Sequence, residues 1–275
     1  MHSVIRNITA SLILIAAFAL PGAAQAGDGS AGDLRYNLRM DLAVTAIAAT
    51  GWAVTWAGVG HMAPANCRWC SVNSFDDWGH RNIKWSNTSA PSRASDVLAY
   101  VAAPMAAYGL DALAANHDGR LNDFWVDALL ITEAVALSQF ATQLVKIAVG
   151  RQRPYAHYGG GSQGPRDNIS FYSGHTSLAF SLAVASGTVA QMRGYRLAPA
   201  IWGTGLAIAA TASYLRLAAD KHYLTDTIAG AVLGSAFGFG IPYLFHRPKS
   251  NGPPPVSISA APTSGGAMLM FSGRI

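Results

Sequence analysis

The chain has 275 residues, of which 51% are hydrophobic and only 12% are charged, about half the charged share of a typical soluble domain. This composition excludes an intrinsically disordered chain. The 19 basic residues are scattered along the chain, which argues against nucleic-acid binding despite a formal net charge of +5. Two cysteines exclude a disulfide-dense scaffold. The composition predicts an apolar, mainly helical protein of a membrane or of the cell envelope.

Residues 1–26 have the features of a secretory signal peptide. Arg6 precedes a short apolar stretch at 11–20, and Ala24-Gln25-Ala26 matches the small-x-small cleavage pattern. The stretch is shorter than the about 20 residues that span a bilayer, so cleavage is favoured over an uncleaved anchor. The sequence therefore predicts export to a bacterial periplasm, which is an oxidising compartment.

A Gly/Asp-rich lead-in at 27–39, expected to be flexible, precedes six segments of helical length and apolar character. These segments are 40–60, 94–116, 123–149, 173–192, 197–217 and 225–246. Asp123 and Thr225 are expected N-caps, and Gly150 is an expected helix end. The predicted fold is an all-α bundle of about six helices over 40–247, with the active site at one end.

The tail at 248–275 differs from the body. Pro253-Pro254-Pro255 ends any helix, and residues 256–261 and 267–275 flank a Pro/Gly-rich turn. This pattern is typical of a small β-hairpin. A disordered end is an equal alternative, because an isolated hairpin is marginally stable in water.

The helices carry conflicting signals about a membrane. Their low charge favours spanning, but 123–149 also carries polar residues that are costly in lipid unless they face the bundle interior. These residues are Asp127, Glu133, Gln139 and Gln143. A cleaved leader leaves the mature N-terminus outside, so six full spans would place the site described below in the cytoplasm. We favour a membrane-bound protein with a periplasm-facing site; a soluble periplasmic bundle is the alternative.

Two polar clusters lie at predicted helix ends. Lys146 and Arg153 stand seven residues apart around the end of the third helix, where basic residues ordinarily complement the helix dipole. Ser173-Gly174-His175 opens the fourth helix. Ser173 is a natural N-cap, free backbone N–H groups at a helix start bind anions, and Gly174 permits close approach of a ligand. An ordinary cap with a surface histidine is the alternative.

The third cluster joins the fifth and sixth helices and contains Arg216, His222 and Asp226. The carboxylate of Asp226 can accept a proton from one imidazole nitrogen of His222 and direct the other nitrogen outward. Taken alone, this is also a structural His–Asp cap pair. In an up-down bundle, however, all three clusters share one end. Three cations, a helix N-terminus and two histidines in one pocket are the groups that phosphoryl transfer needs.

The order Lys-x6-Arg-Pro, Ser-Gly-His and Arg-x5-His-x3-Asp at 146–226 resembles the three-part signature of the type 2 phosphatidic acid phosphatase superfamily. That superfamily includes lipid phosphate phosphatases, bacterial class A acid phosphatases and vanadium haloperoxidases. The resemblance covers about residues 94–246. Tyr172 and Leu215 stand where the family usually has Pro and Ser, and these departures concern substrate preference and loop rigidity.

The resemblance implies a role for each matching residue. His222 attacks phosphorus to form a phosphohistidine, Asp226 orients His222, and His175 protonates the leaving alcohol and later helps to activate water. The phosphate oxygens are bound by Lys146, Arg153, Ser173, the Gly174 amide and Arg216. No metal or other cofactor is implied.

Cys67 and Cys70 lie in the loop after the first helix, between His61 and His80. In an exported protein a disulfide is favoured, with a Cys/His zinc site or reduced thiols as alternatives. Aromatic residues of this loop are expected to pack, with substrate-facing or interfacial roles as the alternative. They are Trp69, Phe75, Trp78 and Trp85. His157, Arg151 and Arg166 are expected either at the pocket rim or as solvated loop residues.

The leading hypothesis is a phosphatase acting on phosphomonoesters or pyrophosphates, chiefly of lipids such as phosphatidic acid or isoprenyl pyrophosphates. One alternative is a haloperoxidase that holds vanadate as its cofactor in the same pocket. Another is an envelope protein that binds lipid phosphates without turnover. The sequence predicts no nucleic-acid partner and specifies no oligomeric state.

Overall fold

The computed structural model describes residues 32–248 and, in the tail, residues 256–263 and 266–273. The predicted signal peptide at 1–26 and the first part of the lead-in lie outside the described residues. The long helices are α2 (Leu38–Ala57), α6 (Ala103–His117), α7 (Phe124–Val149), α9 (Gly174–Arg193), α10 (Ala198–Ala218) and α11 (Leu224–Ile241). Shorter helices are α3 (Val59–Met62), α4 (Ser74–Ile83), α5 (Ser89–Val97) and α8 (Pro154–Tyr158).

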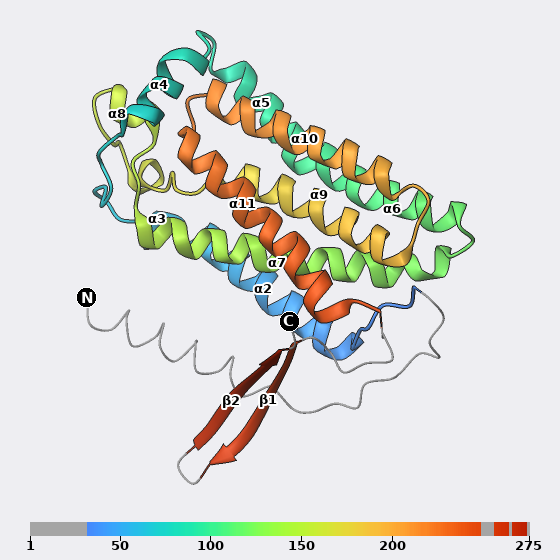
Figure 1. Ribbon diagram of the computed structural model, residues 1–275. Coiled ribbons are helices and arrows are strands. Elements are labelled where there is room, and N and C mark those ends of the chain that lie inside the picture. Colours follow the sequence, from blue (N-terminus) through green and yellow to red (C-terminus); the bar gives the residue numbers. More distant parts are fainter. Residues whose placement is uncertain (1–31, 249–255, 264–265, 274–275) are drawn as a thin grey trace.

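Four further helical turns complete the bundle: η1 (Leu98–Ala102), η2 (Leu121–Asp123), η3 (Pro165–Asn168) and η4 (Pro242–His246). Helix α5 continues through η1 into α6, and α11 continues into η4, so six long helical stretches run along the molecule (Figure 1). The predicted all-α class is confirmed. The short helix α4 was not predicted, because its ten residues fall in a polar loop sequence and its start depends on a cap by Asn73.

Helix α9 forms the centre of the bundle, packed against α6, α7, α10 and α11 (Figure 1). Fourteen of its 20 residues are buried, and most of these are Ala, Ser, Gly, Thr or Val. Small side chains allow neighbouring helix backbones to approach closely, which is the usual packing device of helices in membranes. Leu130 and Ile131 of α7 and Leu182 of α9 provide the larger core side chains.

The helix ends follow the sequence signals in part. Gly150 ends α7 in the left-handed conformation with φ of 61°, and Ser173 caps α9 by accepting from the backbone N–H of Thr176. Asp123 is the N-cap residue of α7 as predicted, but its side chain makes no capping hydrogen bond, because the carboxylate pairs with Arg120 at 2.6 Å. Thr225 lies inside α11 rather than at its cap; the backbone N–H of the N-cap residue bonds to the Asp226 carboxylate.

The tail contains the hairpin. Strands β1 (Val256–Thr263) and β2 (Gly266–Gly273) pair antiparallel, with Val256 opposite Gly273. The alternation of the tail sequence, interrupted by Gly and Pro residues, is thus sufficient to specify two strands.

Within the described residues, four helical stretches are long and apolar enough to cross a membrane: Leu38–Ala57, Ser89–His117, Leu121–Val149 and Leu224–His246. Their outward faces carry large exposed apolar side chains such as Met105 and Val232, 69% and 62% exposed. The objection from polar residues in α7 falls away, because Asp127, Glu133 and Gln143 are buried in the bundle and Gln139 lines the cavity described below. These surfaces support association with a membrane.

A row of glycines brings α11 against α9. A Cβ atom at Gly234 would lie 2.5 Å from the carbonyl oxygen of Ser177, and Gly230 and Gly238 make equally close approaches to α9 one turn away on either side. Gly240, on the same helix, has nothing within 4 Å of its Cβ position.

We therefore expect Gly234→Ala to lower the free energy of unfolding by about 1–3 kcal/mol, because the methyl group forces the two backbones apart. Gly240→Ala should be neutral or stabilising by up to about 1 kcal/mol, because alanine is the better helix former. Thermal unfolding of both variants in detergent tests this expectation. Equal stability of the two variants would contradict it.

Candidate active site

The end of α7, the start of α9, the end of α10 and the start of α11 lie at one end of the bundle (Figure 1). A cavity of about 320 Å³ opens among them. Its lining includes six of the predicted site residues: Lys146, Arg153, Gly174, His175, Arg216 and His222. Ser173 and Asp226 are fully buried behind this lining. The structure thus brings the three predicted clusters together.

The basic side chains of the cavity are positioned mainly by hydrogen bonds to uncharged groups. Lys146 Nζ donates to the carbonyl oxygens of Ile169 and Ser170, at 2.9 and 3.4 Å. Arg153 Nη1 donates to the Lys221 carbonyl at 2.9 Å. Carbonyl oxygens position these side chains without neutralising them.

The charged lining of the cavity is strongly unbalanced. It contains one carboxylate, Asp96, and five basic residues. The basic residues are Lys146, Arg153, Arg166, Arg216 and Lys221. Buried or half-buried cations without counterions are costly, so the site is electrostatically suited to an anion that carries more than one negative charge.

His222 presents one imidazole nitrogen to these cations. Its Nε2 lies 3.5 Å from Arg153 Nη1, and its side chain is buried. Burial, together with the charges of Arg153, Lys146 and Arg216, lowers the pKa of His222 well below its usual value. The imidazole is therefore neutral at pH 7, which leaves a lone pair free on one ring nitrogen.

The expected hydrogen bond from His222 to Asp226 is not made. Nδ1 of His222 lies 3.6 Å from Asp226 Oδ2, beyond hydrogen-bond range, and has no other partner. Asp226 Oδ2 instead accepts from Ser170 Oγ at 2.5 Å and from the Tyr223 backbone N–H at 3.0 Å. The carboxylate nevertheless faces Nδ1, and catalytic contacts of this kind commonly tighten only when substrate binds.

Arg151 is the unexpected member of the site. The sequence predicted either a pocket-rim residue or a solvated loop residue. Arg151 is neither, because its side chain is only 1% exposed. It donates to Asp226 Oδ1 at 2.6 Å and to Asp76 Oδ2 at 2.7 Å. Its guanidinium also lies over the rings of Trp69 and Tyr223, at 4.0 and 4.2 Å. Arg151 thereby compensates the buried charge of Asp226 and leaves the cavity cations uncompensated.

The start of α9 completes the oxyanion environment. Gly174 is the first residue of the helix, and a Cβ atom there would lie 3.5 Å from Lys146 Cε. The free N–H groups of this helix end and the ammonium of Lys146 thus share one side of the cavity.

Residues 127–250 match the family model of the PAP2 superfamily, a span that includes all three clusters. The matched region, which is less than half of the chain, is thus similar to the PAP2 superfamily. The match supports a phosphatase of that superfamily. Among solved structures, the chain is similar to a transmembrane PAP2-type phosphatidylglycerolphosphate phosphatase from Bacillus subtilis, at 14% identity and a TM-score of 0.36. The similarity covers 74% of this chain and 91% of that chain. No curated protein matches the sequence.

Asp96 lies outside the matched PAP2 region, and no pattern in the sequence pointed to it. Its Oδ1 accepts from His175 Nε2 at 2.7 Å and from Arg216 Nη1 at 3.3 Å. Burial and the charges of Arg216, Arg153 and Lys146 lower the pKa of His175 to about 2. A bound anion would offset those charges and favour the protonated imidazole.

The loop before the PAP2 region contains the two cysteines. Cys67 and Cys70 form a disulfide, and His80 pairs with Asp220 at 2.8 Å. A Cys/His zinc site is therefore excluded for these residues. Disulfide sulfurs are not thiolate ligands, and His80 is already paired with Asp220.

The aromatic residues of this loop do not pack as a group. Trp69 lies against Phe171 and Arg151, but Phe75, Trp78 and Trp85 are 49%, 53% and 41% exposed. Arg166 lines the cavity, whereas His157 is exposed and does not. Trp85 nevertheless contacts Tyr214, and its indole N–H donates to the Tyr214 hydroxyl at 3.2 Å, so the expectation of packing holds for Trp69 and in part for Trp85.

Asp96 competes with any anion for Arg216, so removing its charge should strengthen anion binding. We expect Asp96→Asn to bind inorganic phosphate roughly fivefold more tightly, the equivalent of about 1 kcal/mol for a half-exposed ion pair. Calorimetry with phosphate measures this directly. Asp118→Asn, at the far end of the bundle, is the control and should not change the affinity. Unchanged or weaker binding by Asp96→Asn would show that Asp96 does not face the anion.

Proposed function

We propose that this chain hydrolyses the phosphate esters or pyrophosphates of lipids through a phosphohistidine formed at His222. The observation that carries the proposal is the cavity with five basic residues and one acid, into which an unprotonated, buried imidazole projects. An anion-binding site alone needs no nucleophile. A neutral imidazole among cations is the arrangement that nucleophilic attack on phosphorus requires.

In the first step, the Nε2 lone pair of His222 attacks phosphorus and the P–O bond to the leaving alcohol breaks. Protonated His175 gives its proton to the departing oxygen. In the second step, His175 takes a proton from water, the water oxygen forms a bond to phosphorus, and the P–N bond breaks to release phosphate. Lys146, Arg153 and Arg216 stabilise the charge on the three equatorial oxygens throughout. Every group used belongs to the protein, so the proposal involves no metal.

A lipid substrate is supported by the surroundings of the cavity. Trp52 and Trp56 of α2 and Tyr100 of η1 contribute to its lining, and Trp56 and Tyr100 are more than half exposed. Both elements belong to candidate membrane spans. A phosphorylated head group can therefore reach the cations while its acyl or isoprenyl chain stays along apolar helix surfaces. The membrane face on which the site opens is proposed to be the periplasmic one, following the predicted export signal.

His222→Ala should lower kcat/KM by at least about 10³-fold, because it removes the atom that forms the covalent bond. His157→Ala, which alters an exposed histidine of α8 outside the cavity lining, is the matched control and should retain activity. The assay is phosphate release from phosphatidic acid, an isoprenyl pyrophosphate and glycerol 3-phosphate by purified protein in detergent. Quenching in alkaline detergent, which preserves the acid-labile P–N bond, should trap label from substrate radiolabelled in its phosphoryl group on the wild type and not on His222→Ala.

Near wild-type turnover by His222→Ala would end the proposed mechanism. Turnover of glycerol 3-phosphate as efficient as that of both lipids would instead remove the lipid specificity and leave the mechanism in place.

The pH dependence tests the electrostatics of the nucleophile. A lowered pKa keeps His222 unprotonated down to acidic pH, so the acid limb of kcat/KM lies below the value for an ordinary histidine. After burial, the charge of Arg153 is the largest influence that lowers this pKa. Arg153→Gln should therefore raise the pKa of His222 and move the acid limb to higher pH.

The substrate ionises identically for every variant, so a displaced limb reports on the enzyme. Arg166→Gln removes an exposed arginine of the same cavity and should leave the limb where it is in the wild type. An acid limb at the same pH for wild type and Arg153→Gln would show that Arg153 does not control His222.

A further inference from the structure

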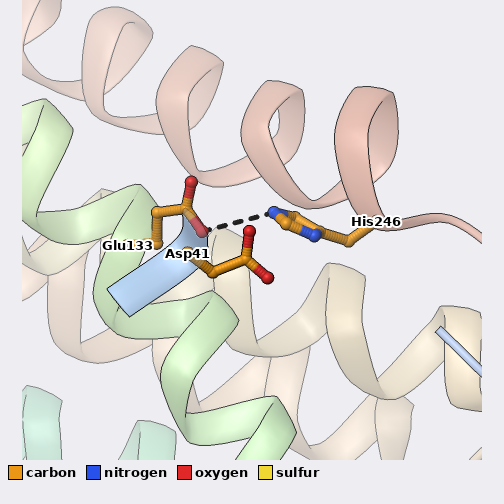
Figure 2. Close-up of side chains that lie close together, drawn as sticks. All are labelled: Asp41, Glu133 and His246. Atoms are coloured by element: carbon orange, nitrogen blue, oxygen red, sulfur yellow. Dashed lines mark ion pairs between the residues drawn. The ribbon is translucent and has the colours of Figure 1, made fainter. Parts of the chain in front are cut away.

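Three ionisable side chains meet in the bundle away from the phosphate cavity. Asp41 of α2, Glu133 of α7 and His246 of η4 point toward one another (Figure 2), and each is less than 10% exposed. One ligand atom from each lies within 4.8 Å of the others. Glu133 precedes Lys146 by 13 residues on α7, a separation of about 20 Å along the helix. The cluster is therefore separate from the candidate active site.

The protonation of His246 is fixed by its neighbour. Nδ1 lies 3.0 Å from the backbone carbonyl oxygen of Arg35, and a carbonyl only accepts, so Nδ1 carries a hydrogen. In the neutral imidazole, Nε2 then presents a lone pair. It faces Glu133 Oε2 at 3.4 Å, and neither atom has a hydrogen-bond partner. Two buried electron-pair donors that face each other require a positive charge between them, which either a proton on Nε2 or a metal ion can supply.

The charges of the cluster lead to the same requirement. Two carboxylates and a neutral imidazole carry a charge of −2 in a buried setting. Within the described part of the chain, no lysine or arginine pairs with any of the three side chains. Asp41 accepts only a backbone N–H, from Asn37 at 2.8 Å. Glu133 is the single glutamate of the chain, and it is placed inside this cluster.

We propose that Asp41, Glu133 and His246 bind one divalent transition-metal ion of the Zn²⁺ class. Two ligands at about 2.1 Å from a tetrahedral ion lie about 3.4 Å apart. This is the distance between Glu133 Oε2 and His246 Nε2. A divalent ion neutralises both carboxylates, and an imidazole ligand favours Zn²⁺ over Mg²⁺ or Ca²⁺. The bond from His246 Nδ1 to a backbone carbonyl is the usual outer-shell support of a metal-binding histidine.

The ion would join three segments that are distant in the sequence: the start of α2, the middle of α7 and the end of the helical body. Because α2 also supplies Trp52 and Trp56 to the cavity, the ion would hold one cavity wall in position from the opposite end of that helix. The site does not depend on the proposed phosphatase activity, and its test uses no activity measurement.

The test is Zn²⁺ binding by tag-free, chelator-treated protein, measured by elemental analysis and by competition with a chromophoric chelator. The wild type should bind one ion per chain with a rise in the midpoint of thermal unfolding. Glu133→Gln and His246→Ala should each abolish Zn²⁺ binding or weaken it by more than about 100-fold. Loss of an outer-shell partner costs only about 10- to 100-fold in metal affinity, so a larger loss indicates a direct ligand. Asp111→Asn is the matched control, because Asp111 is a buried carboxylate of α6 without a hydrogen-bond partner. It should still bind one ion.

X-ray absorption at the zinc edge of the wild-type protein should show one imidazole nitrogen and oxygen ligands, without sulfur. This measurement keeps the proposal testable if a ligand variant does not fold. Failure of the wild type to bind Zn²⁺ would mean that a proton on His246 supplies the positive charge and would overturn the proposal. Unchanged binding by Glu133→Gln, or a different ligand set, would overturn it as well.

Discussion

The buried carboxylate of Asp226 connects the three segments that carry the site. Its oxygens accept from Arg151, which lies between Lys146 and Arg153, and from Ser170, just before the second cluster. They also accept from the backbone of Tyr223, next to His222. One side chain thus fixes the relative positions of all three clusters. Breaking a buried ion pair of this kind costs about 3–5 kcal/mol, which makes the arrangement rigid.

The same contacts decide where positive charge remains available. Arg151 is shared by two carboxylates, those of Asp226 and Asp76, so it adds no net charge to the cavity. Lys146 and Arg153, by contrast, are positioned by carbonyl oxygens. Buried ion pairs therefore hold the segments of the site in place, and the cations without a counterion attract the anion. This separation lets the site remain preorganised for charge that develops during reaction.

Apolar segments of helical length, bounded by helix-ending residues, predicted the six long helical stretches to within about five residues. The clusters were predictable because short connections place the ends of successive helices together. The roles of Arg151 and Asp96 were not predictable from a local pattern. The partners of Arg151 lie about 75 residues away in the sequence, and those of Asp96 lie about 80 and 120 residues away. The expected cap bonds are lost to other partners: the Asp123 carboxylate pairs with Arg120 three residues earlier, and the Thr225 hydroxyl donates to Asp76 of α4.

Helix α2 shows why polar contacts carry special weight in an apolar bundle. Of its 20 residues only Asp41 and Ala48 are buried, so core packing contributes little to its position. Between helices in lipid there is no hydrophobic driving force, because the outside is as apolar as the neighbouring helix. What holds α2 must then be small-residue contacts, such as Gly51 against Phe140, and the polar cluster at its start. Because the other end of α2 carries Trp52 and Trp56 into the cavity, the contacts that position α2, including those around Asp41, also bear on the position of this cavity wall.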